Sequence, residues 1–476
     1  MMMTRKIFMM IMMLILFITF NEVNGQTNDH RWDNLENIIN SGIAEKAFPG
    51  AVLLVANKDG PIYSKAFGKF TYNDDEQRVM NTNTTKFDMA SVTKVISTTS
   101  AVALLYQKDL ISLHDSVVKY FPEFGVNGKS GITIENLLLH NSGLAPDPNP
   151  TYNTVEFNCS ATEIYHPPQV FTCSNKIFNS WLNEKLAHNI GEKYVYSDLS
   201  MISLMYIIGQ IVKKNMNLLQ ISNDDLRSDC VSQIGLNAPG HETCYFEAFV
   251  RKHVLEQLGM SNSGYIPNRY DVNIPPAWLD EVYHHDLIQG YVSDENCYAQ
   301  GGISGHAGIF STLPDVYNFM DELMFRRREN FIDSTTFSLF TSVKNTQQSS
   351  RALGWDTNAE GNGSCGSLSK KTFLHLGFSG TQVCGDPERN LFTIFLTNRV
   401  YPDKNVNKIG KYRNQVNSEV QAVYDKYYAS DNSTGVIIAI VVILAIGLLC
   451  GVGVTIAGLY YKLRLEKRNE YAGLLK

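Results

Sequence analysis

The sequence predicts an α/β fold of the α+β kind. One antiparallel sheet is built from both ends of a large outer domain, and an all-helical lobe is inserted between them. Three observations predict this fold. A strand hairpin pattern stands near the N-terminus, helical periodicity fills the middle of the chain, and residues 351–400 alternate as strands do.

The N-terminal elements follow from apolar spacing and turn residues. Residues 32–46 place apolar side chains at helical spacing, which predicts a helix with one apolar side. Residues 51–56 and 62–67 are apolar strand segments, and Asn57–Gly60 between them is rich in turn residues. The pattern predicts a helix followed by a strand hairpin.

The predicted helices of the lobe are residues 91–107, a segment after Thr133, 198–214 and 246–258. Two insertions between them, residues 145–193 and 215–243, lack clear periodicity. The first insertion is either an ordered cover over the functional site or a flexible segment, and we favour the cover.

Both chain ends carry segments that lie outside the fold. A basic start, a short apolar run and small residues predict a signal peptide at residues 1–25. Residues 436–461 are apolar and uncharged and precede a basic cluster, which predicts a transmembrane helix with a cytoplasmic tail at 462–476. Residues 26–435 are then the extracytosolic domain of a single-pass type I membrane protein.

The tail also suggests where the protein resides. The segment Glu470–Leu475 contains an acidic dileucine pattern and a tyrosine pattern that resemble endosomal sorting signals. Either an endosomal sorting adaptor binds this segment or the tail is inert, and the position just beyond the basic cluster favours the adaptor. We therefore expect residence at the cell surface or in endosomal or lysosomal membranes.

Charge limits the ligands of the outer domain. The chain has a formal net charge of −6, and because both end segments are net basic, the outer domain carries the whole acidic excess. This argues against nucleic acid as a partner. The run His284-His285-Asp286 lacks a third ligand at a useful spacing, so no metal and no cofactor is expected.

Cysteines and glycosylation acceptors agree with an oxidising compartment. Outer cysteines cluster in pairs that suggest local disulfides, and one is left over as a buried free thiol. The expected pairs are Cys159/Cys173, Cys230/Cys244 and Cys365/Cys384, with Cys297 unpaired. Acceptor motifs for N-glycosylation stand at Asn83, Asn158 and Asn362, whereas the one at Asn432 is too close to the membrane.

Three short motifs in fixed order carry the chemistry. They are Ser91-Val92-Thr93-Lys94, Tyr196-Ser197-Asp198 and His375-Leu376-Gly377. Residues three apart share a helix face, so Ser91 and Lys94 point the same way, and Ser91 stands at a helix N-terminus that favours developing negative charge. A serine beside a lysine and a tyrosine is suited to acyl transfer.

With their flanking segments, these motifs resemble the serine beta-lactamase and penicillin-binding protein superfamily in its class C-like branch. The similar segments are 87–94, 132–144, 294–296, 301–312 and 375–381, and the resemblance covers about residues 30–428. It implies a beta-lactamase/transpeptidase-like fold.

The resemblance also implies roles for the motif residues. Ser91 is the nucleophile that forms an acyl-enzyme, and Lys94 and Tyr196 handle its proton and activate the water. Backbone N–H groups of Ser91 and Phe378 hold the oxyanion. The substrate lies along the strand edge of the third motif, where Gly377 allows close backbone approach.

Two departures from the family pattern change these expectations. Asp198 replaces an asparagine, and its carboxylate favours a charged Lys94, which shifts the base role toward Tyr196. His375 replaces a lysine, so recognition of a substrate carboxylate would depend on pH, and activity is expected to rise toward mildly acidic pH. His140 and His306 are interpreted as loop residues rather than catalysts.

The predicted function is a membrane-anchored serine hydrolase that acts on a small ester, amide or D-amino-acid peptide. It would resemble an esterase or a D-Ala carboxypeptidase or aminopeptidase, and it would not be an efficient beta-lactamase. The alternative is a catalytically silent receptor or scaffold that retains the fold.

Overall fold

The computed structural model describes residues 30–154, 157, 171–326 and 331–429. The chain divides into two units, residues 1–420 and 421–476, and the sheet, the helical lobe and the cleft described below all belong to the first. The predicted signal peptide, transmembrane helix and tail lie outside the described residues. Within them, no helix is both long and apolar enough to cross a membrane.

The main sheet has six antiparallel strands in the order β2-β1-β11-β10-β9-β8. Their bounds are β1 (Gly50–Asn57), β2 (Gly60–Gly68), β8 (Asp356–Thr357), β9 (Phe373–Leu376), β10 (Gln382–Asp386) and β11 (Leu391–Thr397). Strands from the two ends of the domain meet where Ala51 pairs with Thr397 and Asn57 with Leu391. This confirms the prediction of a sheet built from both chain ends.

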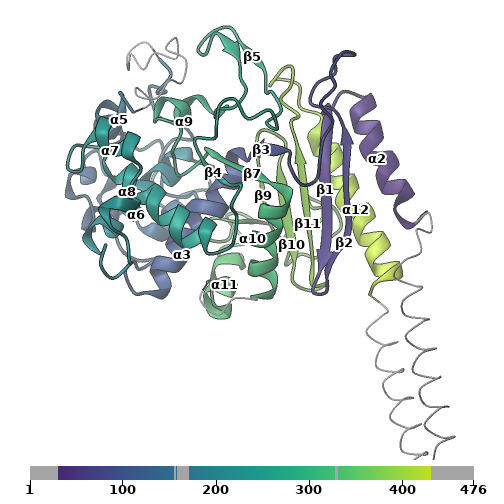
Figure 1. The fold of residues 1–476 in the computed structure, drawn as a ribbon. Coiled ribbons are helices and arrows are strands. Elements are labelled where there is room, and N and C mark those ends of the chain that lie inside the picture. The colour runs from purple at the N-terminus through teal and green to yellow at the C-terminus, as the bar shows by residue number, and fades with distance from the viewer. Residues whose placement is uncertain (1–29, 155–156, 158–170, 327–330, 430–476) are drawn as a thin grey trace, which may run out of the picture. The chain divides into compact units, whose positions relative to one another are not determined.

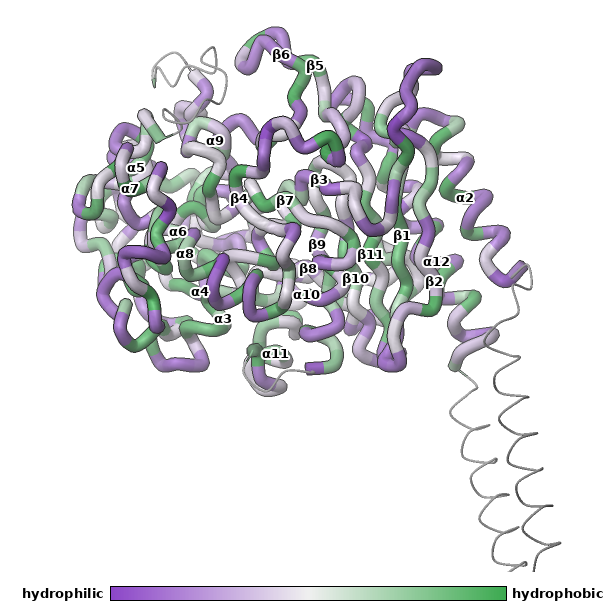
Figure 2. The backbone as a smooth tube through the Cα atoms, viewed as in Figure 1, coloured by the Kyte–Doolittle hydropathy of each residue, from purple (hydrophilic) through white to green (hydrophobic). Residues whose placement is uncertain are grey.

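Helices cover both faces of this sheet (Figure 1). On one face lie α2 (Asp33–Ala44) and the first part of α12 (Ile409–Tyr427), and on the other lies α10 (Leu313–Phe325). Because they are covered on both faces, β1 and β11 are buried along their whole length and almost continuously apolar (Figure 2). The edge strand β2 is only partly buried.

The helical lobe is inserted between β2 and β8. It contains α3 (Ser100–Gln107), α4 (Ile134–Leu138), α5 (Ser174–Asn183), α6 (Asp198–Lys214), α7 (Ser228–Ile234), α8 (Glu242–Val250), α9 (Glu295–Ala299) and α11 (Ser334–Thr341). At its centre, α6 is buried on nearly all sides and packs on α8. Gly209 permits this close crossing, because a Cβ there would overlap the backbone of Glu242.

Small strands connect the lobe to the sheet. The three-stranded sheet β3-β7-β4 consists of β3 (Lys86–Asp88), β7 (Ile309–Thr312) and β4 (Gly264–Tyr265), and a hairpin forms from β5 (Leu279–Asp280) and β6 (Asp286–Leu287). The small sheet matters for the site, because β3 leads directly into the segment that carries Ser91.

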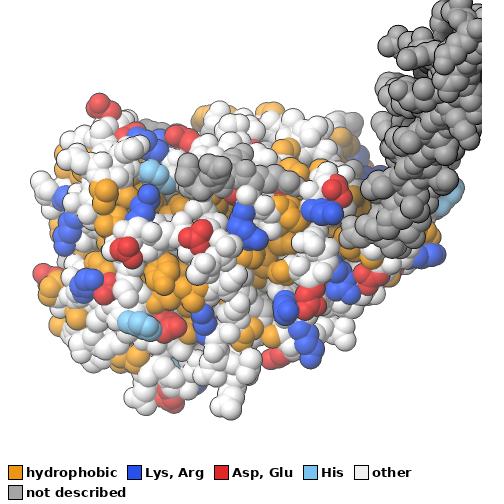
Figure 3. Space-filling view, turned by 90° about the horizontal axis from the view of Figure 1, so that it is seen from below, with side chains coloured by type: hydrophobic (Ala, Val, Ile, Leu, Met, Phe, Trp, Pro, Cys, Tyr) orange, Lys and Arg blue, Asp and Glu red, His pale blue; other side chains and the backbone are white. Residues whose placement is uncertain are grey.

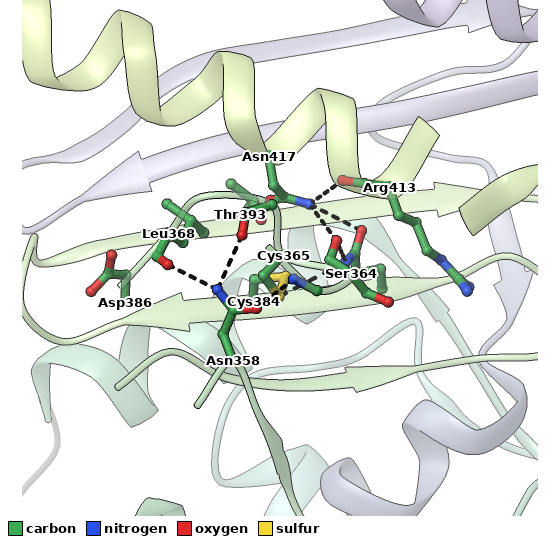
Figure 4. Close-up of a disulfide and its surroundings, with 12 residues drawn as sticks. Asn358, Ser364, Cys365, Leu368, Cys384, Asp386, Thr393, Arg413 and Asn417 are labelled. Atoms are coloured by element: carbon green, nitrogen blue, oxygen red, sulfur yellow. Dashed lines mark hydrogen bonds between the residues drawn. A yellow bond between two sulfur atoms is a disulfide. The ribbon is translucent and has the colours of Figure 1, made fainter. Parts of the chain in front are cut away.

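Two of the predicted disulfides are present among the described residues, Cys230–Cys244 and Cys365–Cys384. The second ties the segment before β9 to β10, next to Asn417 of α12, which accepts a hydrogen bond from Thr393 (Figure 4). Cys173 is also disulfide-bonded, but its predicted partner Cys159 lies outside the described residues. Cys297 is a buried free thiol, as predicted.

The surface is mixed in charge. On the face shown in Figure 3, basic and acidic side chains are interspersed with apolar ones. Asn83 and Asn362 are exposed, as glycosylation would require, whereas Asn158 lies outside the described residues. Glycosylation therefore stays a prediction.

Candidate active site

The segment that carries Ser91 is held in an unusual backbone conformation. Ala90, just before it, has a φ of +45°, which a residue with a side chain seldom adopts. The Asp88 carboxylate secures this turn, because it accepts hydrogen bonds from Ala90 N at 2.9 Å and from both the N–H and the hydroxyl of Ser293 at 2.9 and 2.7 Å. Ser91 is thereby fixed at the start of the helical run.

That helical run corrects the prediction of one regular helix over residues 91–107. Ser91 lies in a 3-10 turn, η2 (Ala90–Val92), which is followed by a π-helical segment, η3 (Lys94–Thr99), and only then by α3. Such segments are common at functional sites, where they change the direction of side chains. Ser91 and Lys94 still face each other.

Lys94 is fully buried and lies at the centre of the site. Its Nζ donates to Ser91 Oγ at 2.8 Å and to the His306 carbonyl at 2.9 Å, and it lies 2.8 Å from Asp198 Oδ1. Burial by itself would lower the pKa of Lys94. The neighbouring Asp198 and Tyr196 outweigh burial and raise that pKa above its usual value, so the side chain is an ammonium.

Tyr196 contacts both Lys94 and a histidine. The Lys94 Nζ is 4.9 Å from the centroid of the Tyr196 ring, and the centroid of the His140 ring is 4.7 Å from it. His140 Nδ1 accepts a hydrogen bond from Ser197 N at 3.1 Å, which holds the second motif against the 132–144 loop. Burial lowers the pKa of His140 well below its usual value, so it acts as a neutral organiser of the loop, as predicted.

The third motif lies against the nucleophile segment. A Cβ on Gly377 would lie only 2.6 Å from the Met89 carbonyl, so the glycine allows this segment to lie against the nucleophile segment. Close approach of a substrate backbone at Gly377 stays a prediction. Thr381 Oγ1 and Ser379 Oγ donate to the Met89 and Asp88 carbonyls at 2.9 and 2.7 Å. Phe378 follows with a half-exposed side chain, and within the described residues its N–H has no acceptor.

His375 does not behave as the sequence suggested. It is 3% exposed, its Nδ1 lies 3.1 Å from the Leu376 carbonyl, and its Nε2 has no partner among the described residues. Burial, together with the nearby Arg351 and Lys94, lowers its pKa well below the usual value. It therefore stays neutral at mildly acidic pH, which removes the physical basis for the predicted rise in activity there.

Sequence reasoning missed Asp294 and underestimated His306. His306 Nε2 lies 2.9 Å from Asp294 Oδ1, and its Nδ1 lies 2.7 Å from Ser304 Oγ. Together with Asp198 these two residues place three potential metal ligands within 4.8 Å of one another. The Lys94 ammonium on Asp198 and the Asp294–His306 hydrogen bond already use those atoms, so the group is a hydrogen-bonded network.

Two cavities meet at Ser91. One, of about 340 Å³, is bordered by the second and third motifs. The other, of about 750 Å³, is bordered by Asp147, Thr151 and Asn153 among others. These three residues belong to the insertion that was expected to cover the site, so this part of the insertion borders the cleft, and the cover stays a prediction. Ser91, Tyr196 and Phe378 border both cavities, so a substrate could contact Ser91 from either side.

Comparisons with known proteins identify the family and the fold. The family model described as Beta-lactamase matches residues 35–222 and 240–418. N-acetylmuramyl-L-alanine amidase of Bacillus subtilis (strain 168) is 28% identical over 418 residues, which cover 81% of this chain and 86% of that protein.

Solved structures share the fold. A penicillin-binding protein homologue from Caulobacter crescentus superposes with a TM-score of 0.59 at 15% identity, over 83% of this chain and 97% of its own. EstCE1, a hydrolase with promiscuous acyltransferase activity, superposes with a TM-score of 0.57 at 18% identity. The superposition covers 83% of this chain and 100% of the EstCE1 chain. Because the family match spans most of the sequence, the chain belongs to the beta-lactamase family, within the superfamily of serine hydrolases that its motifs resemble.

Proposed function

We propose that the protein is a membrane-anchored serine hydrolase that forms an acyl-enzyme on a small ester, amide or D-amino-acid peptide outside the cytosol. One observation carries this proposal. The Ser91 hydroxyl faces a substrate-sized cleft and accepts a 2.8 Å hydrogen bond from a fully buried, charged Lys94, which Asp198 holds beside Tyr196. The membrane anchor and the location rest on the sequence alone.

In the proposed acylation step, Tyr196 takes the proton of Ser91 as Oγ attacks the carbonyl carbon. Lys94 is a poor acceptor for that proton, because Asp198 keeps it protonated. Its ammonium instead stabilises the phenolate form of Tyr196, which becomes neutral when it takes the serine proton. The Ser91 and Phe378 N–H groups would hold the oxyanion.

In the proposed deacylation step, a water attacks the acyl-enzyme, and Tyr196 takes a proton from that water and returns it to Ser91 Oγ as the acyl C–O bond breaks. The leaving group has by then departed with the proton first taken from Ser91, so the substrate plus one water becomes an acid and an alcohol or amine. Amide substrates are supported by the Bacillus relative, which is named an amidase. Efficient beta-lactam hydrolysis is not expected, because His375 is neutral and supplies no positive charge.

The experiment is labelling of the soluble ectodomain with a fluorophosphonate, read out by intact mass. One adduct is expected on the wild-type protein and none on Ser91→Ala. Ser367, which starts a second serine–lysine motif outside the cleft, offers the matched control Ser367→Ala, and this variant should label normally. A folded wild-type protein that takes no label and hydrolyses no activated ester would instead support the silent scaffold.

A further inference from the structure

The cleft has opposite net charge at its two ends. The smaller cavity, which we call the basic end, is bordered by three guanidinium groups and one carboxylate, namely Arg351, Arg399, Arg413 and Asp356. The larger cavity, the acidic end, is bordered by four carboxylates and two cations, namely Asp147, Asp198, Asp294, Glu295, Lys404 and Arg399, the last of which borders both cavities. Ser91 lies where the two ends meet, so the polarity runs across the position of a scissile bond.

Two of the three guanidinium groups at the basic end lack a counter-ion among the described residues. Arg413 is 7% exposed and donates only to the Gly377 and Thr381 carbonyls, and its Nε has no partner among the described residues. Arg399 likewise donates only to backbone carbonyls. Within the described part of the chain neither forms an ion pair, whereas Arg351 lies 3.3 Å from Asp356.

Buried charge without a partner is costly, so an anion bound at this end would be stabilised. Burial and the nearby Arg399 lower the pKa of Arg413 to about 9, which an anionic ligand would reverse. The neutral His375 adds an Nε2 without a partner to the same cavity. The arginines, rather than the histidine of the third motif, therefore supply the positive charge.

The acidic end retains one carboxylate without a cation. Asp198 pairs with Lys94, Asp294 with His306, and Glu295 with Lys404 at 2.9 Å. Asp147 has no such partner in the described residues, and its pKa is raised by partial burial and by the charges of Asp198 and Asp294. A cationic group of a ligand would relieve this repulsion.

We propose that the natural substrate is a small zwitterion, such as an unblocked dipeptide-like amide. Its ammonium lies toward Asp147, its carboxylate lies toward Arg399 and Arg413, and its scissile carbonyl lies at Ser91. This inference rests on the proposed function and names its substrate class. Hydrolysis consumes one water, breaks the C–N bond and leaves the two charged ends on separate products.

The test uses four forms of alanyl-alanine: unmodified, N-acetylated, C-terminally amidated, and blocked at both ends. Each form is made in the L,L and D,D series. Product formation gives kcat/KM for each, and hydrolysis of p-nitrophenyl acetate serves as the charge-independent reference. One of the two stereochemical series is expected to be cleaved. In that series, N-acetylation and C-terminal amidation should each lower kcat/KM by about 10-fold or more, the usual effect of losing a charge-assisted hydrogen bond.

Variants assign the two ends. Asp147→Asn should give equal kcat/KM for substrates with a free and an acetylated amine, while the difference in kcat/KM between carboxylate and amide substrates remains. Asp59→Asn in the exposed β1–β2 turn is the matched control. Arg413→Gln should do the reverse, because Arg413 borders the basic end and not the acidic end. The proposal of a zwitterionic substrate is overturned if the enzyme hydrolyses p-nitrophenyl acetate but cleaves all four forms equally. It is also overturned if the enzyme hydrolyses this ester but cleaves none of the four forms. Loss of p-nitrophenyl acetate hydrolysis as well would overturn the proposed function.

Discussion

At the scale of single residues, the charge state of Lys94 decides how the site works. A lysine in this position can act as a base only if it is neutral, and burial alone would make it so. The Asp198 carboxylate at 2.8 Å reverses that effect and keeps the proton on Lys94. In the proposed mechanism, the aspartate of the second motif therefore directs the serine proton to Tyr196 rather than to Lys94.

Asp198→Asn should lower the pKa of Lys94, because burial then acts without the opposing carboxylate. Activity that depends on the ammonium should disappear at lower pH than in the wild type. The kcat/KM for a neutral activated ester, measured from pH 5 to 10, checks this. The unpaired buried ammonium should also cost about 3 kcal/mol in urea unfolding. If kcat/KM falls at the same alkaline pH in the wild type and in Asp198→Asn, Asp198 does not control the charge of Lys94.

Tyr196→Phe should lower turnover by a factor on the order of 10²–10⁴, the range for loss of a general base. The variant keeps the ring contacts with His140 and Lys94 and loses only the hydrogen bond between the hydroxyl and Lys94, so it should fold with a melting temperature slightly below that of the wild type. Steady-state rates with an activated ester measure the loss. A rate near that of the wild type would place the base elsewhere.

His375→Gln should leave the shape of the pH–rate profile between pH 5 and 7 unchanged, because the pKa of His375 already lies well below this window. Its amide can still occupy the cavity. If the wild type instead gains activity toward pH 5 and the variant does not, His375 titrates in this range after all, and the earlier expectation from the sequence is restored.

At the scale of elements, close backbone contacts set the geometry. The α6–α8 crossing depends on Gly209, and α6 begins at Asp198, so this packing also positions the site. The sequence predicted α6 and the N-terminal hairpin because each has strong periodicity. It did not predict α10, α11 or α12: α11 is short, and α12 is a mostly polar helix.

Two glycine substitutions should have opposite effects on stability. Gly209→Ala would force the α6–α8 crossing apart and should cost about 1–3 kcal/mol, whereas Gly410→Ala in α12 meets open space and should gain about 0.5–1 kcal/mol. Urea unfolding of both variants beside the wild type measures this. A neutral Gly209→Ala would mean that the crossing tolerates a methyl group.

At the scale of the whole molecule, the cellular location predicted from the tail is independent of the pH dependence predicted from the active site. Replacing Tyr471, Leu474 and Leu475 by alanine should strand the protein at the plasma membrane, which surface biotinylation measures. Replacement of Lys476 by alanine is a control outside both patterns. An unchanged distribution favours cell-surface residence. Because His375 stays neutral, residence in an acidic compartment no longer implies activation there.

The sequence by itself determined the order of the motifs, the sheet made from both chain ends and two of the disulfide pairs, because these follow from local spacing and residue type. Only the tertiary structure decided the charge pattern of the cleft. Arg351, Arg399, Arg413 and Asp147 come from four separate segments. The burial and the ion pairing of these side chains depend on contacts with residues far away in the sequence. Such contacts cannot be predicted from local sequence patterns.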